Sequence, residues 1–333
     1  MGARPPISDA ESPTIGAPTP LADTGRREGG ASLQGIAPHP VVSRASAVFV
    51  RNFLQDAAMA SGGDFIDAMI RMAITEANVR HVLADDAESR RFAAFDQPVP
   101  DDLRRPVSIH GVSTSLSMPF ETVRRRVARL TKRDLCSPVP GGLIVTQAQL
   151  STEAMRVLQD RTYRGVVDLY ARVKPHAQLN DARDDEPALE VSAPPVRVVT
   201  RPALSYVLRY LESAEPVAGS MLDGILLIFI AGANIQHLAT PGTDAASDEV
   251  VDDALRQPIP VFALARGMSL PAETVRRHVN GLVEQGLCQR DHRGVFVPAA
   301  VLRSPALTEH RARNLVSLQR LFAALRRAGV RLD

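Results

Sequence analysis

The sequence predicts a mainly α-helical fold with two small β-hairpins, and it predicts that one folding unit occurs twice. Apolar residues recur at helical spacing in both halves of the chain. A stretch beginning at Leu270, LPAETVRRHVNGLVEQGLC, has a near copy, MPFETVRRRVARLTKRDLC, beginning at Met118. Each copy is followed by a turn that contains glycine and by a short β-branched run, which is typical of a hairpin.

The repeat extends well beyond this stretch. Pro106–Val145 aligns with Pro258–Val297 without a gap, and 14 of the 40 positions are identical. A match of this length indicates that a whole domain was duplicated. The expected organisation is a tail over 1–43, a first repeat over 44–174, an acidic linker over 175–200 and a second repeat over 201–333.

The tail and the linker are expected to lack a fold of their own. The tail is rich in Pro, Gly, Ala, Ser and Thr and has no hydrophobic periodicity. The net charge of the whole chain is +2, which is too small to argue for a nucleic-acid partner. Any such argument therefore rests on local charge.

Each repeat is expected to begin with two helices, over about 44–58 and 63–83 in the first copy. A short helix over 109–116 and a tight turn over 116–118 follow. A longer helix then begins at Pro119, because proline is tolerated in the first turn of a helix. The expected buried stripe of this longer helix is Val123, Val127 and Leu130.

Each repeat is expected to end with a hairpin and one further helix. In the first copy a strand starts at Leu135, PVPGG forms the turn, and LIVT is the return strand. The closing helix covers 152–173. In the second copy DHRG is the turn and VFVP the return strand.

Helix, short turn, helix and hairpin form the winged helix-turn-helix arrangement. The segment VFALARGMSLPAETVRRHVNGLVEQGLCQRDHRGVFVP resembles the DNA-binding domain of bacterial winged-helix transcription regulators of the GntR, DeoR, IclR and MarR type. The matching residues are Leu264, Ala265, Met268, Thr274, Val275, Arg276, Leu282, Gly286 and Leu287. The first copy departs from the pattern, with Val112, Ser113 and Leu116 in the early positions and Asp134 where glycine is usual. The resemblance implies tandem winged helix-turn-helix domains, each with two preceding helices and one following helix.

The second helix of the motif carries a dense positive charge in the first copy. Residues 119–133 hold six basic side chains against Glu121, a net charge of +5. Such a helix can enter a major groove if its solvent face offers donors to phosphates and base edges. A solvated face with a Glu121–Arg125 pair is the alternative, but one pair leaves five charges unexplained. The residues expected to contact DNA here are Thr122, Arg124, Arg125, Arg126, Arg129 and Arg133.

The second copy distributes its charge differently. Residues 271–285 have a net charge of zero, and basic residues occur in the wing instead. The wing of the first copy, by contrast, is uncharged. One interpretation is that both copies contact DNA, and the other is that the second copy serves packing or dimerisation. The candidate DNA contacts of the second copy are Thr274, Arg276, Arg277, His278, Arg290, His292 and Arg293.

Two apolar surfaces are candidates for a homodimer seam. The segment Gly224–Ile235 is apolar nearly all round, so it is expected to pack between the halves or between two subunits. The closing helix of the second copy offers the other surface, through Leu315, Leu318, Phe322 and Leu325. For both surfaces an ordinary intradomain core is the alternative.

Three polar or small residues recur at equivalent positions. Asn78 and His81 recur as Asn234 and His237, and a buried polar pair that fixes the helix to its own hairpin domain is favoured over a metal site. Cys136 and Cys288 also recur, and each is expected to be a small buried side chain.

These features favour a cytoplasmic, sequence-specific transcriptional regulator that binds double-stranded DNA. A plasmid-type replication initiator and a protein-interaction adaptor without DNA binding are the alternatives. The sequence has no catalytic motif, metal-ligand set or cofactor-binding loop, so neither an enzyme nor a cofactor is expected. No signal peptide is recognised, and the apolar run from Gly224 is too short to span a bilayer, so no membrane partner is expected.

Overall fold

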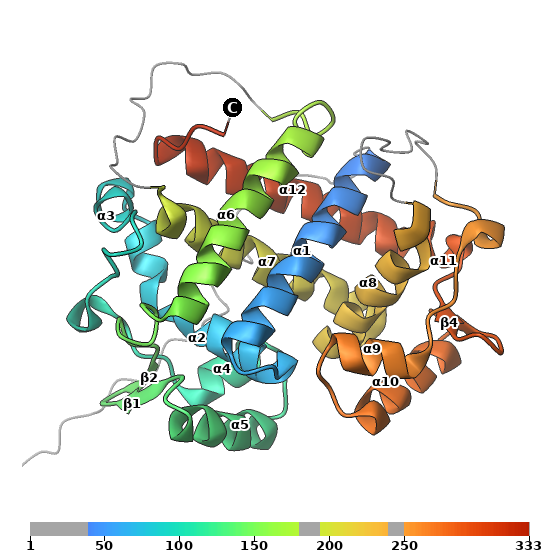
Figure 1. Cartoon of the computed structure of the whole chain (residues 1–333), viewed down its shortest axis with the longest axis horizontal. Helices are drawn as coiled ribbons and strands as arrows, with labels where there is room; N and C mark the ends of the chain where they lie inside the picture. Colours follow the sequence, from blue (N-terminus) through green and yellow to red (C-terminus); the bar gives the residue numbers. More distant parts are fainter. Residues whose placement is uncertain (1–38, 180–193, 239–249, 333) are drawn as a thin grey trace, which may run out of the picture.

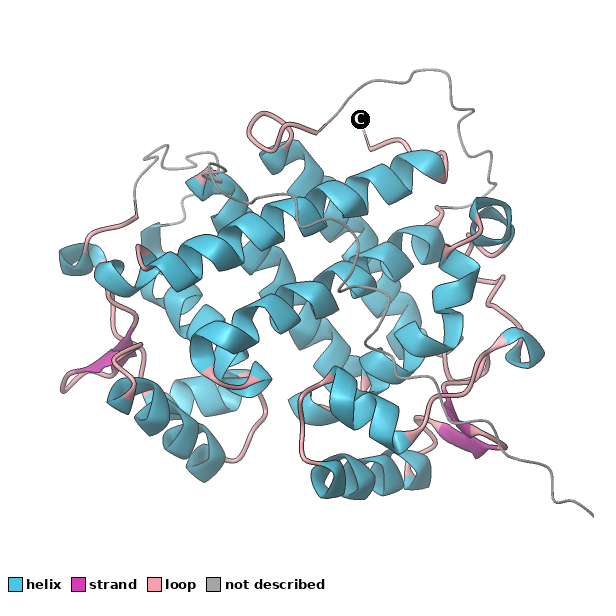
Figure 2. Cartoon of the chain, turned by 180° about the vertical axis from the view of Figure 1, so that it is seen from behind, coloured by secondary structure: helices cyan, strands magenta, loops and turns pink. Residues whose placement is uncertain are grey.

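The computed structural model describes residues 39–179, 194–238 and 250–332 of the chain. Within these ranges the chain is mainly helical, and its sheets are two small antiparallel hairpins (Figures 1 and 2). The predicted mainly α class with two small hairpins is therefore confirmed.

The first half contains six α-helices, one 3-10 turn and one hairpin among its described residues. In chain order these are α1 (Pro40–Ala60), α2 (Phe65–Leu83), α3 (Asp86–Arg91), η1 (Asp101–Leu103), α4 (Ile109–Ser115), α5 (Phe120–Lys132), β1 (Ser137–Val139), β2 (Gly142–Ile144) and α6 (Glu153–Val173).

The second half presents its long helices, its short helix pair, its hairpin and its closing helix in the same order. Its elements are α7 (Val196–Ala218), α8 (Met221–Ile235), η2 (Gln236–Leu238), η3 (Asp253–Leu255), α9 (Val261–Gly267), α10 (Ala272–Glu284), β3 (Gln289–Arg290), β4 (Val295–Phe296), α11 (Ala299–Leu302) and α12 (Pro305–Arg327).

The first helix of each half begins earlier than predicted. Helix α1 starts at Pro40, inside the predicted tail, and the ring of His39 accepts a hydrogen bond from the backbone N–H of Val41 at 3.3 Å. Proline suits this position because its missing N–H has no partner in a first turn anyway. Helix α7 starts at Val196, so the end of the predicted linker is helical. The rest of the predicted tail and linker, 1–38 and 180–193, lies outside the described residues.

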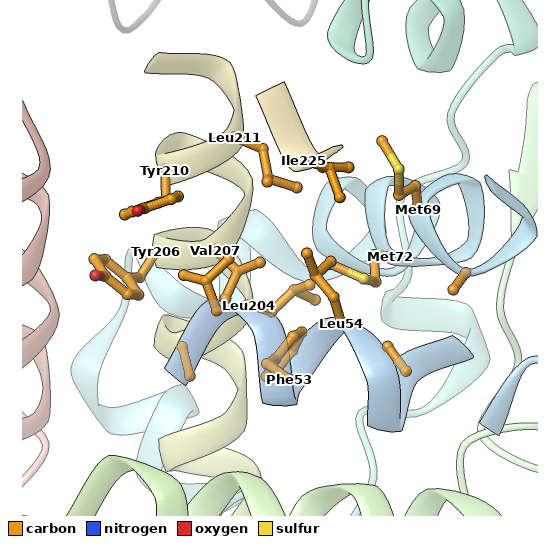
Figure 3. Close-up of a cluster of buried hydrophobic side chains, with 14 of the residues drawn as sticks. Phe53, Leu54, Met69, Met72, Leu204, Tyr206, Val207, Tyr210, Leu211 and Ile225 are labelled. Carbon is orange, nitrogen blue, oxygen red and sulfur yellow. The ribbon is translucent and has the colours of Figure 1, made fainter. Parts of the chain in front are cut away.

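The long helices of both halves share one hydrophobic core. Figure 3 shows side chains from four helices that point toward one another, among them Leu54 of α1, Met69 of α2, Val207 of α7 and Ile225 of α8. Each of these side chains is buried. The boundary predicted between the repeats therefore separates two parts of the sequence, whereas the core is continuous across it.

Equivalent residues of the two halves touch each other at two places. The rings of Phe49 and Tyr206, which align in the sequence repeat, have centroids 6.1 Å apart. The rings of Tyr170 and Phe322, which also align, have centroids 5.1 Å apart. Contacts between equivalent residues are typical of an interface with twofold symmetry. The halves of this single chain therefore pack as two subunits of a symmetric dimer would.

The apolar surfaces expected at a homodimer seam are used inside the chain. Helix α12 packs along α7, and the four side chains named for that seam, Leu315, Leu318, Phe322 and Leu325, are buried there. They are consequently not available to a second subunit, and the core alternative is the one observed.

Helix α8 packs between the halves, which is one of the two placements expected for it. It contacts α1, α7 and α10, and its Phe229 ring meets Phe65 edge-on at 5.5 Å. With η2 it gives an apolar stretch, Met221–Leu238, of 18 residues and mean hydropathy 1.5, which is long enough to cross a bilayer. Ile225, Leu226 and Ile230 are buried against other helices, and 44% of the apolar stretch is buried inside the protein.

Each hairpin pairs with an extended residue that lies just before the two short helices of its half, α4–α5 or α9–α10. Val107 forms an isolated bridge with Leu143, and Ile259 forms the equivalent bridge with Val295. The backbone approaches so closely at the second bridge that a Cβ on Gly294 would overlap the carbonyl group of Ile259. Gly294 also has a φ of 154°, so two independent reasons require glycine there.

Replacing Gly294 by alanine is expected to lower the free energy of unfolding by about 3 kcal/mol, because the new methyl group must displace the bridge. Urea unfolding measures the loss. Gly267→Ala is the matched control, since a Cβ at Gly267 meets nothing within 4 Å. Equal stability of the two variants would contradict the role assigned to this close approach.

A buried histidine joins α12 to α7. The Nδ1 atom of His310 lies 2.9 Å from the hydroxyl of Ser213, and the Tyr210 ring meets the imidazole edge-on at 4.8 Å. Burial lowers the pKa of His310 to about 4. The folded protein therefore holds this imidazole in its neutral form at neutral pH.

Stability is expected to decrease as the pH falls from about 6.5 to about 4, because the unfolded chain takes up a proton that folded His310 excludes. The contribution of this one group is about 3 kcal/mol over that range. Urea unfolding of the wild type and of His310→Gln at pH 7, 5.5 and 4 isolates it. The assignment fails if both proteins lose stability in parallel as the pH falls.

Candidate nucleic-acid interface

Helices α5 and α10 are held against the core by their predicted apolar stripes. Val123, Val127 and Leu130 are buried under α5, as the spacing predicts. The turn before each helix contains a residue in the left-handed region, Ser117 with φ 47° and Ser269 with φ 48°. Both turns therefore reverse the chain in the same way and direct the following helix similarly.

An asparagine fixes each hairpin to the long helix behind it. The side chain of Asn78 donates to the carbonyl oxygens of Arg105 and Leu143 at 2.8 and 3.0 Å, and it accepts from the N–H of Val145 at 2.9 Å. Asn234 makes the equivalent three hydrogen bonds in the second half, at 2.8, 3.1 and 3.0 Å. The expectation of a structural role for the asparagine is confirmed.

The histidines do not share this role. No hydrogen-bond partner is found for the buried Nδ1 atom of His81 within the described part of the chain, and His237 is exposed. The asparagine alone therefore forms the link to the hairpin.

Helices α5 and α10 lie along the same edge of the molecule. This edge is the lower one in Figure 1, and Figure 2 shows the same arrangement from behind. A hairpin lies on the outer side of each helix in both views. The two helix pairs are thus placed side by side with their hairpins at the ends.

Two arginines of α5 are bound to carboxylates at the start of α2. Arg126 donates to Asp64 and Asp67 at 2.5 and 3.0 Å. Arg129 donates to the same two carboxylates, at 2.6 Å each. The side chain of Asp67 is fully buried, so these bonds attach α5 to α2 from inside the protein. Arg126 and Arg129 both make this contact. The Arg126 side chain is 21% exposed, less than expected of a solvent-facing group, whereas that of Arg129 is 44% exposed.

The hydrogen bonds of this cluster favour the charged forms of Asp64 and Arg129. Burial by itself would raise the pKa of Asp64, but a hydrogen bond from the N–H of Asp67 and the charges of Arg126 and Arg129 bring that pKa below its usual value. The pKa of Arg129 is raised, first of all by its hydrogen bond to Asp67. Asp64 and Arg129 are consequently both ionised at neutral pH.

The other charges of α5 are also partly compensated. Arg133 lies 3.8 Å from Asp67 and extends over Gly62. Glu121 pairs with Arg124 at 2.7 Å, whereas the sequence suggested Arg125 as its partner. The net charge of +5 counted along the helix therefore overstates the charge that this helix offers to solvent.

One arginine at an equivalent position remains available in each half. Arg125 is exposed, and the contact described for it is a long bond of 3.4 Å from Nε to the carbonyl oxygen of Glu121. Arg277 aligns with Arg125, is exposed, and has no ion pair among the residues that the structure describes. Thr122 and Thr274 are half-buried near the start of the same two helices.

The second half has a weaker link between its helices. His278 of α10 takes the place of Arg126 and lies 2.8 Å from Asp223 of α8. Arg276 is paired with Glu273 at 2.6 Å, as Arg124 is with Glu121. His278 and Arg276 thus have partners inside the chain, and the pairing of Arg276 repeats the first half.

The β3–β4 hairpin of the second half presents part of its predicted charge. Asp291 accepts hydrogen bonds from the N–H groups of Arg293 and Gly294 and pairs with the Arg293 guanidinium at 3.1 Å. Arg290 and His292 are exposed, and no partner for either is found in 39–179, 194–238 or 250–332. Among the described residues of this hairpin, the cation without a partner is therefore Arg290.

The partners of the α5 arginines were missed by the sequence analysis. Asp64 and Asp67 stand about sixty residues before Arg126 and Arg129 in the chain, so no helical spacing connects them. The signal available in the sequence was that Asp67 recurs as Asp223 in the second repeat. The two carboxylates contact equivalent positions, Arg126 of α5 and His278 of α10.

The cysteines are placed as expected. Cys136 and Cys288 are free and buried, and burial raises the pKa of Cys288 to about 12. Among the described residues, no group of three or more His, Cys, Asp or Glu side chains is arranged to hold a metal ion.

No protein-family model, curated protein or solved structure matches this chain. The function is accordingly argued from the geometry alone.

Replacing Asp67 by alanine is expected to lower the free energy of unfolding by about 3 kcal/mol, because it leaves Arg126 and Arg129 without their buried acceptor. Urea unfolding measures this loss. Asp223→Ala is the matched control and should cost about 1 kcal/mol, since Asp223 has a single partner on α10, His278. The assigned anchor is wrong if the two variants lose the same stability.

Proposed function

We propose that this chain is a cytoplasmic transcriptional regulator that binds double-stranded DNA through two winged helix-turn-helix domains. The observation that carries the proposal is the pair of equivalent exposed arginines, Arg125 and Arg277, on α5 and α10 at one edge of the molecule. In this proposal each helix enters a major groove, and each arginine donates to a phosphate or a guanine edge.

The arrangement of the halves supports the use of two half-sites. The symmetric contacts at Phe49–Tyr206 and Tyr170–Phe322 relate one half to the other as in a dimer. Regulators that are symmetric dimers read half-sites related by the same symmetry. A single chain of this protein would therefore contact an imperfect palindrome, with different bases preferred in each half because the two helices differ in sequence.

The paired residues have a positioning role in this proposal. Arg126 and Arg129 set the orientation of α5 through Asp64 and Asp67, and His278 does so for α10 through Asp223. Lys132 on α5 and Arg290 on the second wing are exposed and add backbone contacts. Both halves then contribute comparable free charge, and the second half is a DNA-contacting unit like the first.

A protein-interaction adaptor is the second candidate, and one observation favours it. Phe262 on α9 is 68% exposed and Phe120 at the start of α5 is 47% exposed. Large exposed apolar side chains on this edge suit a protein partner better than a phosphate backbone. An adaptor would bind its partner equally well after nuclease treatment and would not retain DNA.

The test starts from a duplex selected by the purified chain out of a random DNA pool. Affinity is then measured by fluorescence anisotropy between 50 and 200 mM salt. Arg125→Ala and Arg277→Ala are each expected to reduce affinity about tenfold and to lower the slope of log K against log salt by about 1, because each removes one phosphate or base contact.

Arg164→Ala is the matched control for loss of one exposed positive charge. Its side chain is 77% exposed on α6, which is not one of the two helices proposed to enter DNA, and it pairs with Asp160 at 3.0 Å. It should leave both affinity and salt slope unchanged. Selection of no duplex by the wild type, or identical slopes for all four proteins, would refute the proposal.

A further inference from the structure

A cavity of about 80 Å³ lies in the core beside α1 and α2. Its walls come from α1, α2 and α6 of the first half, from α7 of the second half, and from the segments around Val99–Arg104 and Leu150. Both halves therefore line it. None of its walls belongs to α5 or α10, so it is separate from the edge discussed above.

Four arginines line this cavity, and each of them is at least nine-tenths buried. They are Arg71, Arg104, Arg197 and Arg201, with exposed fractions of 5%, 5%, 4% and 9%. No aspartate or glutamate is found among the described residues of its wall. Outside the wall, Asp101 pairs with Arg104 at 3.1 Å and is itself 40% exposed, and the charge of Asp96 acts on Arg197. Buried arginines without carboxylates are unusual, because charges inside proteins are normally paired.

Backbone carbonyl oxygens satisfy only part of the hydrogen-bonding capacity of these groups. Arg71 donates to Ala60 and Gln149, Arg197 donates to Phe95 and Leu150, and Arg201 donates to Phe92. Three buried nitrogens find no acceptor among the described residues: Nε of Arg71, Nη1 of Arg104 and Nη1 of Arg201. Buried donors in native proteins nearly always have a partner.

The positive charges of these arginines also repel one another. Burial lowers the pKa of Arg201 to about 9, with further contributions from the charges of Arg197 and Arg104. Burial likewise lowers the pKa of Arg71 and that of Arg197 to about 10. These three groups therefore remain positively charged at neutral pH, and their charges lie in a cavity wall that is otherwise mainly apolar.

We propose that this cavity is a binding site for a compact oxyanion, a carboxylate or a phosphate, held by the guanidinium groups of Arg71, Arg104 and Arg201. Such an ion supplies the acceptors that the three free nitrogens lack, and guanidinium groups match the geometry of both anions. A water takes up about 30 Å³ of the liquid, so the cavity has room for a group the size of two or three waters. Inorganic phosphate and acetate are of that order, whereas a nucleotide is far too large.

The second half does not repeat the site. Leu227 stands at the position equivalent to Arg71, although Arg256 is retained at the position equivalent to Arg104. Arg256 is buried to the same degree, at 5% exposed, and pairs with Asp253 at 3.3 Å. The second half therefore does not form a second copy of the oxyanion site, and Arg256 offers a matched control.

Thermal unfolding of the full chain tests the site at constant ionic strength, with phosphate or acetate exchanged for chloride. At a ligand concentration one hundred times Kd the melting temperature is expected to rise by about 5 °C, because the anion binds only the folded protein. A response to phosphate, to acetate or to both supports the site and distinguishes the two sources. Calorimetric titration should give one site per chain.

Two variants remove the site in different ways. Arg201→Gln removes a guanidinium, and Ala57→Leu fills the cavity while keeping every arginine. Both are expected to lose the anion-dependent shift, whereas Arg256→Gln should keep it even if its melting temperature is lower. The proposal is overturned if wild type shows neither a shift nor a saturable heat with either anion. It is equally overturned if the shift survives in a folded Arg201→Gln or Ala57→Leu variant.

Discussion

The apolar seam between the two halves is the constraint on which the rest of this structure depends. Phe49 meets Tyr206 and Tyr170 meets Phe322, so the seam brings equivalent residues together. Because each half has the same order of elements, a seam of this symmetry places α5 and α10 on one edge with a hairpin outside each. It also closes the cavity, whose walls come from both halves. The aromatic and aliphatic groups that a homodimer would bury between chains are thus buried within one chain.

Arginine side chains have structural roles at several places in this protein. On α5 it attaches the helix to Asp64 and Asp67, and in the core it holds the carbonyl oxygens of the segment between α2 and α4. A guanidinium suits both tasks, because it can donate to two acceptors at once while remaining charged when buried. The density of arginine along a segment is therefore a poor measure of the charge it offers to a partner. Only the exposed and unpaired groups, such as Arg125 and Arg277, contribute to an electrostatic surface.

The local structure followed from the sequence with small errors. The stripe Val123, Val127 and Leu130 is buried as predicted, and the turn at Ser117 lies where it was expected. The β1–β2 hairpin was expected in this region, but its turn is shorter than the predicted PVPGG, because Pro138 and Val139 belong to β1 and Gly142 to β2. These features depend on periodicity and on turn chemistry, which act over a few residues. The helix starts at Pro40 and Val196 were missed, because they lie at the edges of segments whose composition is typical of a tail and a linker.

By itself, the sequence determined the class of fold, the order of elements in each half and the apolar face of each helix, since all three follow from spacing along the chain. Only the tertiary structure decided which arginines are free. Arg125 and Arg126 are neighbours on α5, yet one faces solvent while the other meets Asp64 and Asp67. The tertiary structure also decided that four arginines surround one cavity. The physical reason is that charge pairing and burial depend on distances between segments far apart in the chain, and no local pattern records those distances.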